Sequence, residues 1–141
     1  MRRYLVVANR TLASGTVLAA IRDATAREPS RFHLLVPASP PGDHAWTEGE
    51  ARTAADARLA DALVLLREQG IEADGEVGDP NPLLAIEDAL REREVDGIIL
   101  STLPAGVSRW LGLDLPHRLT ARFPNIPMTH VIGEEWLSPA G

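Results

Sequence analysis

The 141-residue chain is long enough for one domain, and such a domain buries about 70% of the surface of its unfolded chain. A formal net charge of −6 argues against sequence-independent nucleic-acid binding, and the absence of cysteine excludes disulfides and thiolate metal sites. All 14 basic residues are arginine, which excludes chemistry that needs a lysine. No apolar run approaches the roughly 20 residues that cross a bilayer, so we expect a single cytoplasmic domain over 1–141 with no membrane partner.

Five short apolar or β-branched runs alternate with longer helical patterns, which predicts βα units and a parallel sheet. In chain order the predicted strands cover 3–8, 32–38, 71–77, 95–100 and 128–132. The fourth run is the most apolar and is expected at the centre of the sheet. The last alternates polar and apolar residues and is expected at an edge.

Capping signals mark the starts of three long helices. Ser14 and Asn81 are predicted N-caps, and Thr47 with Glu50 has the spacing of a capping box. Apolar residues recur at three- and four-residue intervals after each cap, namely Val17, Leu18, Ile21 and Ala24; Ala55, Leu59, Leu63 and Leu66; Leu83, Ile86 and Leu90. Gly70 ends the second helix, and shorter helical pieces are predicted at 108–111 and 115–123.

Right-handed crossovers arrange these elements as an α/β, three-layer doubly wound sheet of five parallel strands with helices on both faces. Such sheets bind ligands outside the carboxyl ends of strands, where the strand order reverses. The first and fourth strands are the expected flanks of that point. The loops 9–14 and 101–108 are therefore predicted to meet there.

Polar and small residues in these two loops are candidate ligand contacts. They are Asn9, Arg10, Thr11, Ser101, Thr102, Gly106, Ser108 and Arg109, and Asp114, further along the chain, is a ninth candidate. One interpretation is a site for an anion or small ligand, with Arg109 as the charge partner. The alternatives are a loop that only turns the chain and an Asn9 that bonds local backbone. The sequence leaves both open.

The segments "YLVVANRT", "GEVGDPNPLLAIEDA", "VDGIILSTLPAGVSRWLGLD" and "ARFPNIPMTHVI" together resemble the universal stress protein family, within the adenine-nucleotide alpha-hydrolase-like superfamily. The resemblance spans nearly the whole chain. It implies the strand order 3-2-1-4-5, a homodimer formed through the last strand (Met128–Ile132), and an adenine nucleotide as the ligand of binding members.

The chain departs from the family's nucleotide motif. At the positions of its glycines and of the following serine or threonine stand Ser101, Pro104, Leu113 and Asp114, and the family's acidic residue is matched by Asn9. Pro104 has no N–H to offer a phosphate. Asp114 is expected to cap the next helix and to oppose a phosphate by its charge. We therefore expect weak or no ATP binding in the family's usual mode.

Other side chains favour structural roles. Trp110 is predicted to fill a core or dimer contact rather than to stack on a base, and Asp79 with Pro80 to form a turn. "GVSRW" lacks the second glycine of a nucleophile elbow, so no catalytic residue is predicted. The four histidines, His33, His44, His117 and His130, show no metal-ligand spacing, and no metal site is predicted. His33 and His130 are predicted to pack within strands. Glu134 and Glu135 are predicted to form a solvated tail.

Three hypotheses follow for function. The first is a non-enzymatic regulatory or binding domain with a degenerate nucleotide motif. The second is an adenine-nucleotide-binding protein in which Arg109 or Arg10 replaces the glycines. The third is a slow nucleotide hydrolase that uses Mg²⁺ held by carboxylates such as Asp114.

Overall fold

A computed structural model of the chain describes residues 1–39, 47–106 and 108–133. Five strands form one parallel sheet in the order β3-β2-β1-β4-β5, which confirms the predicted topology. The strands are β1 (Arg2–Val7), β2 (Ser30–Pro37), β3 (Ala73–Gly78), β4 (Gly97–Thr102) and β5 (Met128–Ile132). The helices are α1 (Gly15–Arg27), α2 (Glu48–Glu68), α3 (Pro82–Glu92), α4 (Arg109–Gly112) and α5 (Leu115–Arg122).

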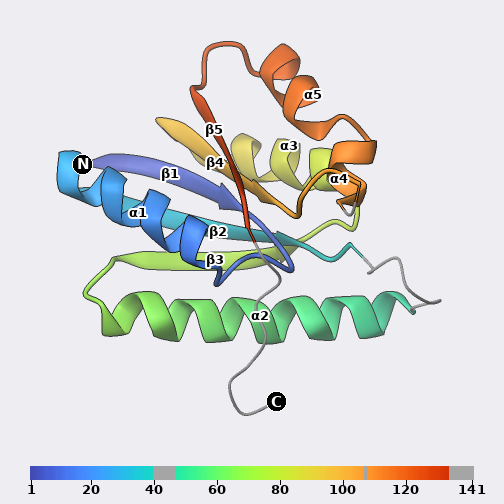
Figure 1. Ribbon diagram of the computed structural model, residues 1–141, viewed down its shortest axis with the longest axis horizontal. Helices are drawn as coiled ribbons and strands as arrows, with labels where there is room; N and C mark the ends of the chain where they lie inside the picture. Colours follow the sequence, from blue (N-terminus) through green and yellow to red (C-terminus); the bar gives the residue numbers. More distant parts are fainter. Residues whose placement is uncertain (40–46, 107, 134–141) are drawn as a thin grey trace.

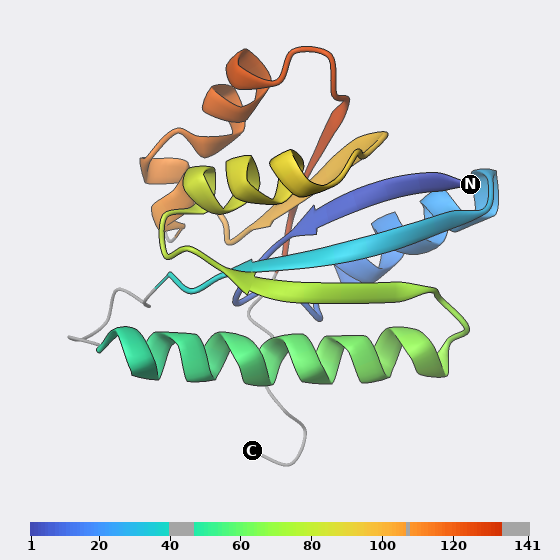
Figure 2. The same ribbon diagram turned by 180° about the vertical axis from the view of Figure 1, so that it is seen from behind.

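Helices cover both faces of the sheet, and successive side chains of the central strand point to opposite cores. Val6 packs with α1 and α2, and Val7 packs with α3, α4 and α5. Figures 1 and 2 show these layers from the two sides. Both valines are fully buried. This accounts for the continuous apolar pattern of the strand, because a parallel strand at the centre of a three-layer fold meets no solvent on either face.

The predicted helix starts at Ser14, Thr47 and Asn81 are confirmed. Ser14 accepts from the N–H of Val17, and Asn81 accepts from the first two N–H groups of α3 that follow Pro82. Thr47 and Glu50 form the complete reciprocal capping box. These caps fix where α1, α2 and α3 begin, directly after the loops that follow β1, β2 and β3.

The fourth strand lies two residues further along the chain than predicted. It pairs with β1 from Gly97, and with β5 as far as Thr102. The ladder continues past the apolar run because Ser101 and Thr102 have the strand partners Val131 and Ile132. These two polar residues are therefore buried at the end of a central strand rather than placed in a loop.

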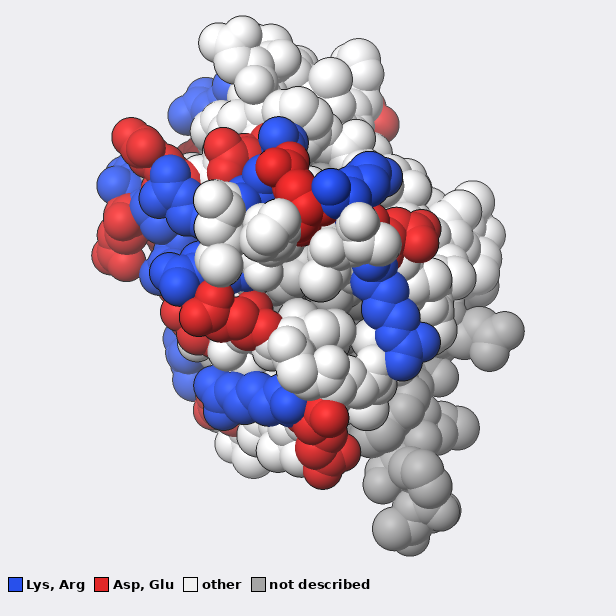
Figure 3. All heavy atoms as spheres, turned by 90° about the vertical axis from the view of Figure 1, so that its left-hand side faces the viewer, with Lys and Arg blue, Asp and Glu red and all other residues white. Residues whose placement is uncertain are grey.

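The end of the sheet at which the strands begin carries mixed charge. In Figure 3, which views this end, blue and red side chains interleave. Arg2 pairs with Glu28, and Arg31 pairs with Glu72. This face has no large patch of a single sign. Among the described residues, no helix is both long enough and apolar enough to span a membrane.

Candidate functional site

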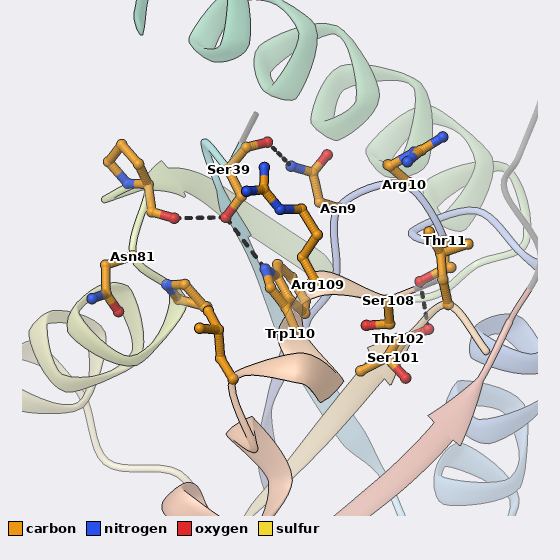
Figure 4. A pocket seen from close by; sticks show the side chains of 14 residues that line it. Asn9, Arg10, Thr11, Ser39, Asn81, Ser101, Thr102, Ser108, Arg109 and Trp110 are labelled. Atoms are coloured by element: carbon orange, nitrogen blue, oxygen red, sulfur yellow. Dashed lines mark hydrogen bonds between the residues drawn. The ribbon is translucent and has the colours of Figure 1, made fainter. Parts of the chain in front are cut away.

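A pocket of about 400 Å³ opens at the carboxyl ends of β1 and β4. Its volume lies in the range of about 300–1,000 Å³ that is typical of small-molecule sites. Side chains from the β1–α1 loop, the end of β4, α4 and the start of α3 surround it (Figure 4). The residues that line it are Asn9, Arg10, Thr11, Ser39, Pro80, Asn81, Pro82, Ser101, Thr102, Leu103, Ser108, Arg109, Trp110 and Leu113.

Seven of the nine candidate residues line this one pocket: Asn9, Arg10, Thr11, Ser101, Thr102, Ser108 and Arg109. Gly106 and Asp114 are not among its lining residues. Gly106 has φ +87°, a backbone conformation that favours glycine, so its role in the structure is to turn the loop. The contact of the other seven with a ligand stays a prediction.

The amide of Asn9 joins three segments of the chain. Its Nδ2 donates to the carbonyl oxygens of Pro37 (2.8 Å) and Ser39 (3.3 Å). Its Oδ1 accepts from Nη1 of Arg58 at 2.6 Å. Asn9 is buried, so these bonds satisfy most of what its side chain can form. The structure thus gives Asn9 hydrogen bonds to backbone carbonyls 28 and 30 residues away, rather than the local backbone bonding that was one of its two predicted roles.

Two hydrogen-bonded pairs, one of two hydroxyls and one of a hydroxyl with an imidazole, form the opposite wall. Oγ1 of Thr11 lies 2.6 Å from Oγ of Ser101, and Oγ1 of Thr102 lies 2.8 Å from Nε2 of His130 on β5. His130 is half-buried, and burial lowers the pKa of its imidazole from the ordinary value of 6.5 because it disfavours the charged ring. His130 lies within β5 as predicted, and its ring bonds with a pocket residue.

Trp110 forms part of the pocket wall and of the core. It is only 8% exposed, and it packs in the cluster beneath α3 and α5, which confirms the predicted core contact. Its Nε1–H donates to Oγ of Ser39, and that hydroxyl in turn donates to the carbonyl oxygen of Pro80. This chain of bonds connects the ends of β2 and β3 to α4 across the pocket.

The lining residues carry positive charge. Arg10 and Arg109 are the ionisable residues among them, and the described part of the lining contains no carboxylate. Ser108 caps α4 by accepting from the N–H of Leu111, so its own O–H remains able to donate. Hydroxyl groups and guanidinium groups in one pocket favour an anion.

The predicted helix cap at Asp114 is wrong. Asp114 precedes α5, but its backbone is left-handed (φ 57°), and its side chain makes no capping hydrogen bond. An N-cap usually has extended backbone, which directs its side chain toward the first N–H groups of the helix. The left-handed turn between α4 and α5 removes that geometry. Because Asp114 does not line the pocket, the predicted repulsion of a phosphate by its charge loses its basis.

Sequence reasoning missed Arg58, and it favoured structural roles for the residues of the segment 80–82, which also line the pocket. A signal for Arg58 was present, since it follows Ala55 by three residues and precedes Ala62 by four, which places it on the buried face of α2. The turn at Asp79 was predicted, and it is confirmed by a bond from the N–H of Asn81 to its carboxylate. Its position beside the pocket depends on the register of β3 against β2.

A second polar cluster lies on β2 and β3. His33 is buried, but its Nδ1 and Nε2 contact carboxylate oxygens of Asp74 (2.8 Å) and Glu76 (2.7 Å), so it is a polar bridge rather than a packing residue. Within the described ranges, no group of three or more histidine and acidic residues is arranged to hold a metal. His44, Glu134 and Glu135 lie outside the described residues.

Neither a family model nor a curated protein matches the sequence. Solved structures match the fold. A protein of the universal stress protein family from Burkholderia pseudomallei superposes with a TM-score of 0.61 at 16% identity, over 92% of this chain and 94% of that one. A universal stress protein from Archaeoglobus fulgidus gives 0.62 at 14%, over 92% and 93%. A universal stress protein family member from Arabidopsis thaliana, solved with AMP bound, gives 0.62 at 10%, over 95% and 93%. The chain therefore has the fold of these proteins.

Proposed function

We propose that this protein is a divergent member of the universal stress protein family that acts as a non-enzymatic binding domain. Its pocket holds a small anionic ligand, and it binds ATP in the family's usual mode weakly or not at all. The fold similarity to three universal stress protein structures supports the assignment. A cytoplasmic location belongs to the same proposal.

The observation that carries the proposal is the positive charge and the hydroxyl groups of the pocket wall. Arg10 and Arg109 line the same pocket as the hydroxyls of Ser101 and Ser108, and the described lining contains no acid to repel an anion. A triphosphate, however, needs several backbone N–H groups at close range. Here Ser101 and Thr102 belong to the strand, and Pro104 has no N–H. The wall therefore suits one anionic group better than three in a row.

Isothermal titration with Mg-ATP, ADP, AMP and cyclic AMP tests this proposal. We expect no saturation by Mg-ATP at micromolar concentrations. Arg109→Ala should weaken the binding of any anion that the pocket holds. Arg118→Ala should leave binding unchanged, because it removes an exposed arginine of α5 that does not line the pocket. Micromolar Mg-ATP affinity would overturn the claim of a degenerate site.

The runner-up function is adenine-nucleotide binding through a modified loop. It is favoured by the AMP bound to the Arabidopsis protein of the same fold and by the position of Arg109 on the pocket. Under this alternative the purified protein carries a nucleotide that denaturation releases. Chromatography of the supernatant after acid precipitation separates the two functions, because the leading proposal predicts no adenine absorbance there.

We also propose a homodimer formed through β5. This strand is an edge of the sheet, and Ile132 is 50% exposed on it. Ile132→Glu would place two like charges near each other across such an interface. Sedimentation equilibrium should give a dimer for the wild type and a monomer for the variant, while a monomeric wild type would exclude the dimer.

A further inference from the structure

The two ends of the pocket differ in chemistry. In Figure 4 the hydroxyls of Thr11, Ser101 and Thr102 lie at one end, and Asn81 lies at the other, with Trp110 between them. Pro80, Pro82 and Leu113 supply apolar lining. We call the first the hydroxyl end (Thr11, Ser101, Thr102 and Ser108) and the second the apolar end (Pro80, Asn81, Pro82, Trp110 and Leu113).

Polar side chains that border the apolar end already have partners. The hydroxyl of Ser39 donates to the carbonyl oxygen of Pro80, and it accepts from the indole N–H of Trp110. Asn81 uses its Oδ1 for two N–H groups of α3, so only its NH₂ group remains, and that group can only donate.

Two carbonyl oxygens near this end each accept a hydrogen bond as well. Those of Pro37 and Ser39 accept from the amide of Asn9, whose own Oδ1 accepts from Arg58. A nucleobase edge presents donors and acceptors side by side, and burying it without partners is costly. The apolar end is therefore a poor match for a base.

The hydroxyl end keeps donors for a ligand. In the Thr11–Ser101 pair one hydroxyl donates its proton to the other, so the hydroxyl that accepts keeps its own proton to donate. Ser108 also retains its O–H, because its oxygen caps α4 by accepting. Arg109 also lines the pocket and adds a charged donor to it, and in Figure 4 its side chain lies between the two ends with its guanidinium on the side of Ser39.

We propose that the ligand is an amphipathic organic anion, with one phosphate or carboxylate group at the hydroxyl end and a body without hydrogen-bonding groups at the apolar end. This inference rests on the proposed anion-binding function and narrows its ligand class. The body packs against Trp110 and Leu113, and the recognition of a base plays no part.

Titration calorimetry with matched probes tests the ligand class. The probes are phenyl phosphate, ribose 5-phosphate, AMP, adenosine, inorganic phosphate and benzoate. Phenyl phosphate should bind about tenfold more tightly than ribose 5-phosphate or inorganic phosphate, because its ring covers apolar side chains. AMP should gain less than threefold over ribose 5-phosphate, and adenosine should not compete. Benzoate against phenyl phosphate then decides between a carboxylate and a phosphate as the preferred head group.

Two exposed leucines provide a matched pair of variants. Leu113 is 55% exposed and lines the pocket, whereas Leu84 is 45% exposed and does not. Leu113→Ala should weaken the binding of phenyl phosphate roughly fivefold and leave the binding of inorganic phosphate unchanged. Leu84→Ala should change the affinity for neither. Because about half of each residue is exposed, truncation of either side chain should leave the fold intact.

The outcomes separate the two proposals. If AMP binds more than tenfold more tightly than phenyl phosphate, or if adenosine competes, the ligand class is wrong while anion binding stands. The same holds if Leu113→Ala changes nothing. If none of the anionic probes binds, the anion-binding function itself fails, and the ligand class fails with it.

Discussion

Replacing Asn9 with alanine removes the hydrogen bonds that hold one wall of the pocket together. The variant leaves two backbone carbonyl oxygens, of Pro37 and Ser39, without a donor, and it takes an acceptor from Arg58. Each such bond contributes about 1 kcal/mol net, and the bond to a charged group somewhat more. Asn9 is 7% exposed, so water replaces few of them. We expect the free energy of unfolding to fall by about 3 kcal/mol.

Urea denaturation followed by circular dichroism measures this loss. With an m-value of about 2 kcal/mol/M, the midpoint should fall by about 1.5 M. Asn81→Ala is the control, because it deletes the same side chain from an exposed helix cap and should cost about 1 kcal/mol. If Asn9→Ala costs no more than this control, water satisfies the wall of the pocket, and the reasoning from buried partners is refuted.

Two further predictions concern packing and pH. Gly75→Ala should destabilise the fold by roughly 1–3 kcal/mol in urea, because its Cβ would lie 2.5 Å from Leu59 Cδ1 and 2.8 Å from the carbonyl oxygen of Leu34. Gly49→Ala, in open space on α2, should instead stabilise by about 0.5 kcal/mol, and equal effects would contradict the packing argument. Because burial lowers the pKa of His130, the unfolded chain binds the proton more readily, so stability should fall as the pH drops below about 6.5. His130→Gln should remove that component, and a stability difference between variant and wild type that is constant from about pH 5 to 8 would count against it.

The topology was predictable from the sequence because its signals are local. Alternating apolar runs and helix caps such as Asn81 identify each βα unit, and the handedness of crossovers then restricts how the units combine. The resemblance to a known family supplied the order of the strands. The predicted topology therefore stays correct even where the predicted end of a strand or helix is wrong by one or two residues.

The details of the site depend on pairing between distant segments. The apolar run before Ser101 gave no sign that β4 continues through it, because the continuation is fixed by partners on β5. Likewise, the bond from Arg58 to Asn9 joins residues 49 positions apart. The error at Asp114 has a different origin: a left-handed turn residue and an N-cap favour the same short acidic side chain.

The bonds of Asn9 also bear on when the pocket forms during folding. Its partners lie 28, 30 and 49 residues away in sequence, so three separate loop closures precede the complete set. Contacts of such long range belong to the late part of folding, after the local helices and the first strand pairs. We therefore expect the loss in Asn9→Ala to appear mainly as faster unfolding, with a nearly unchanged folding rate. The pocket would then be a property of the finished domain alone, absent from any partly folded form of the chain.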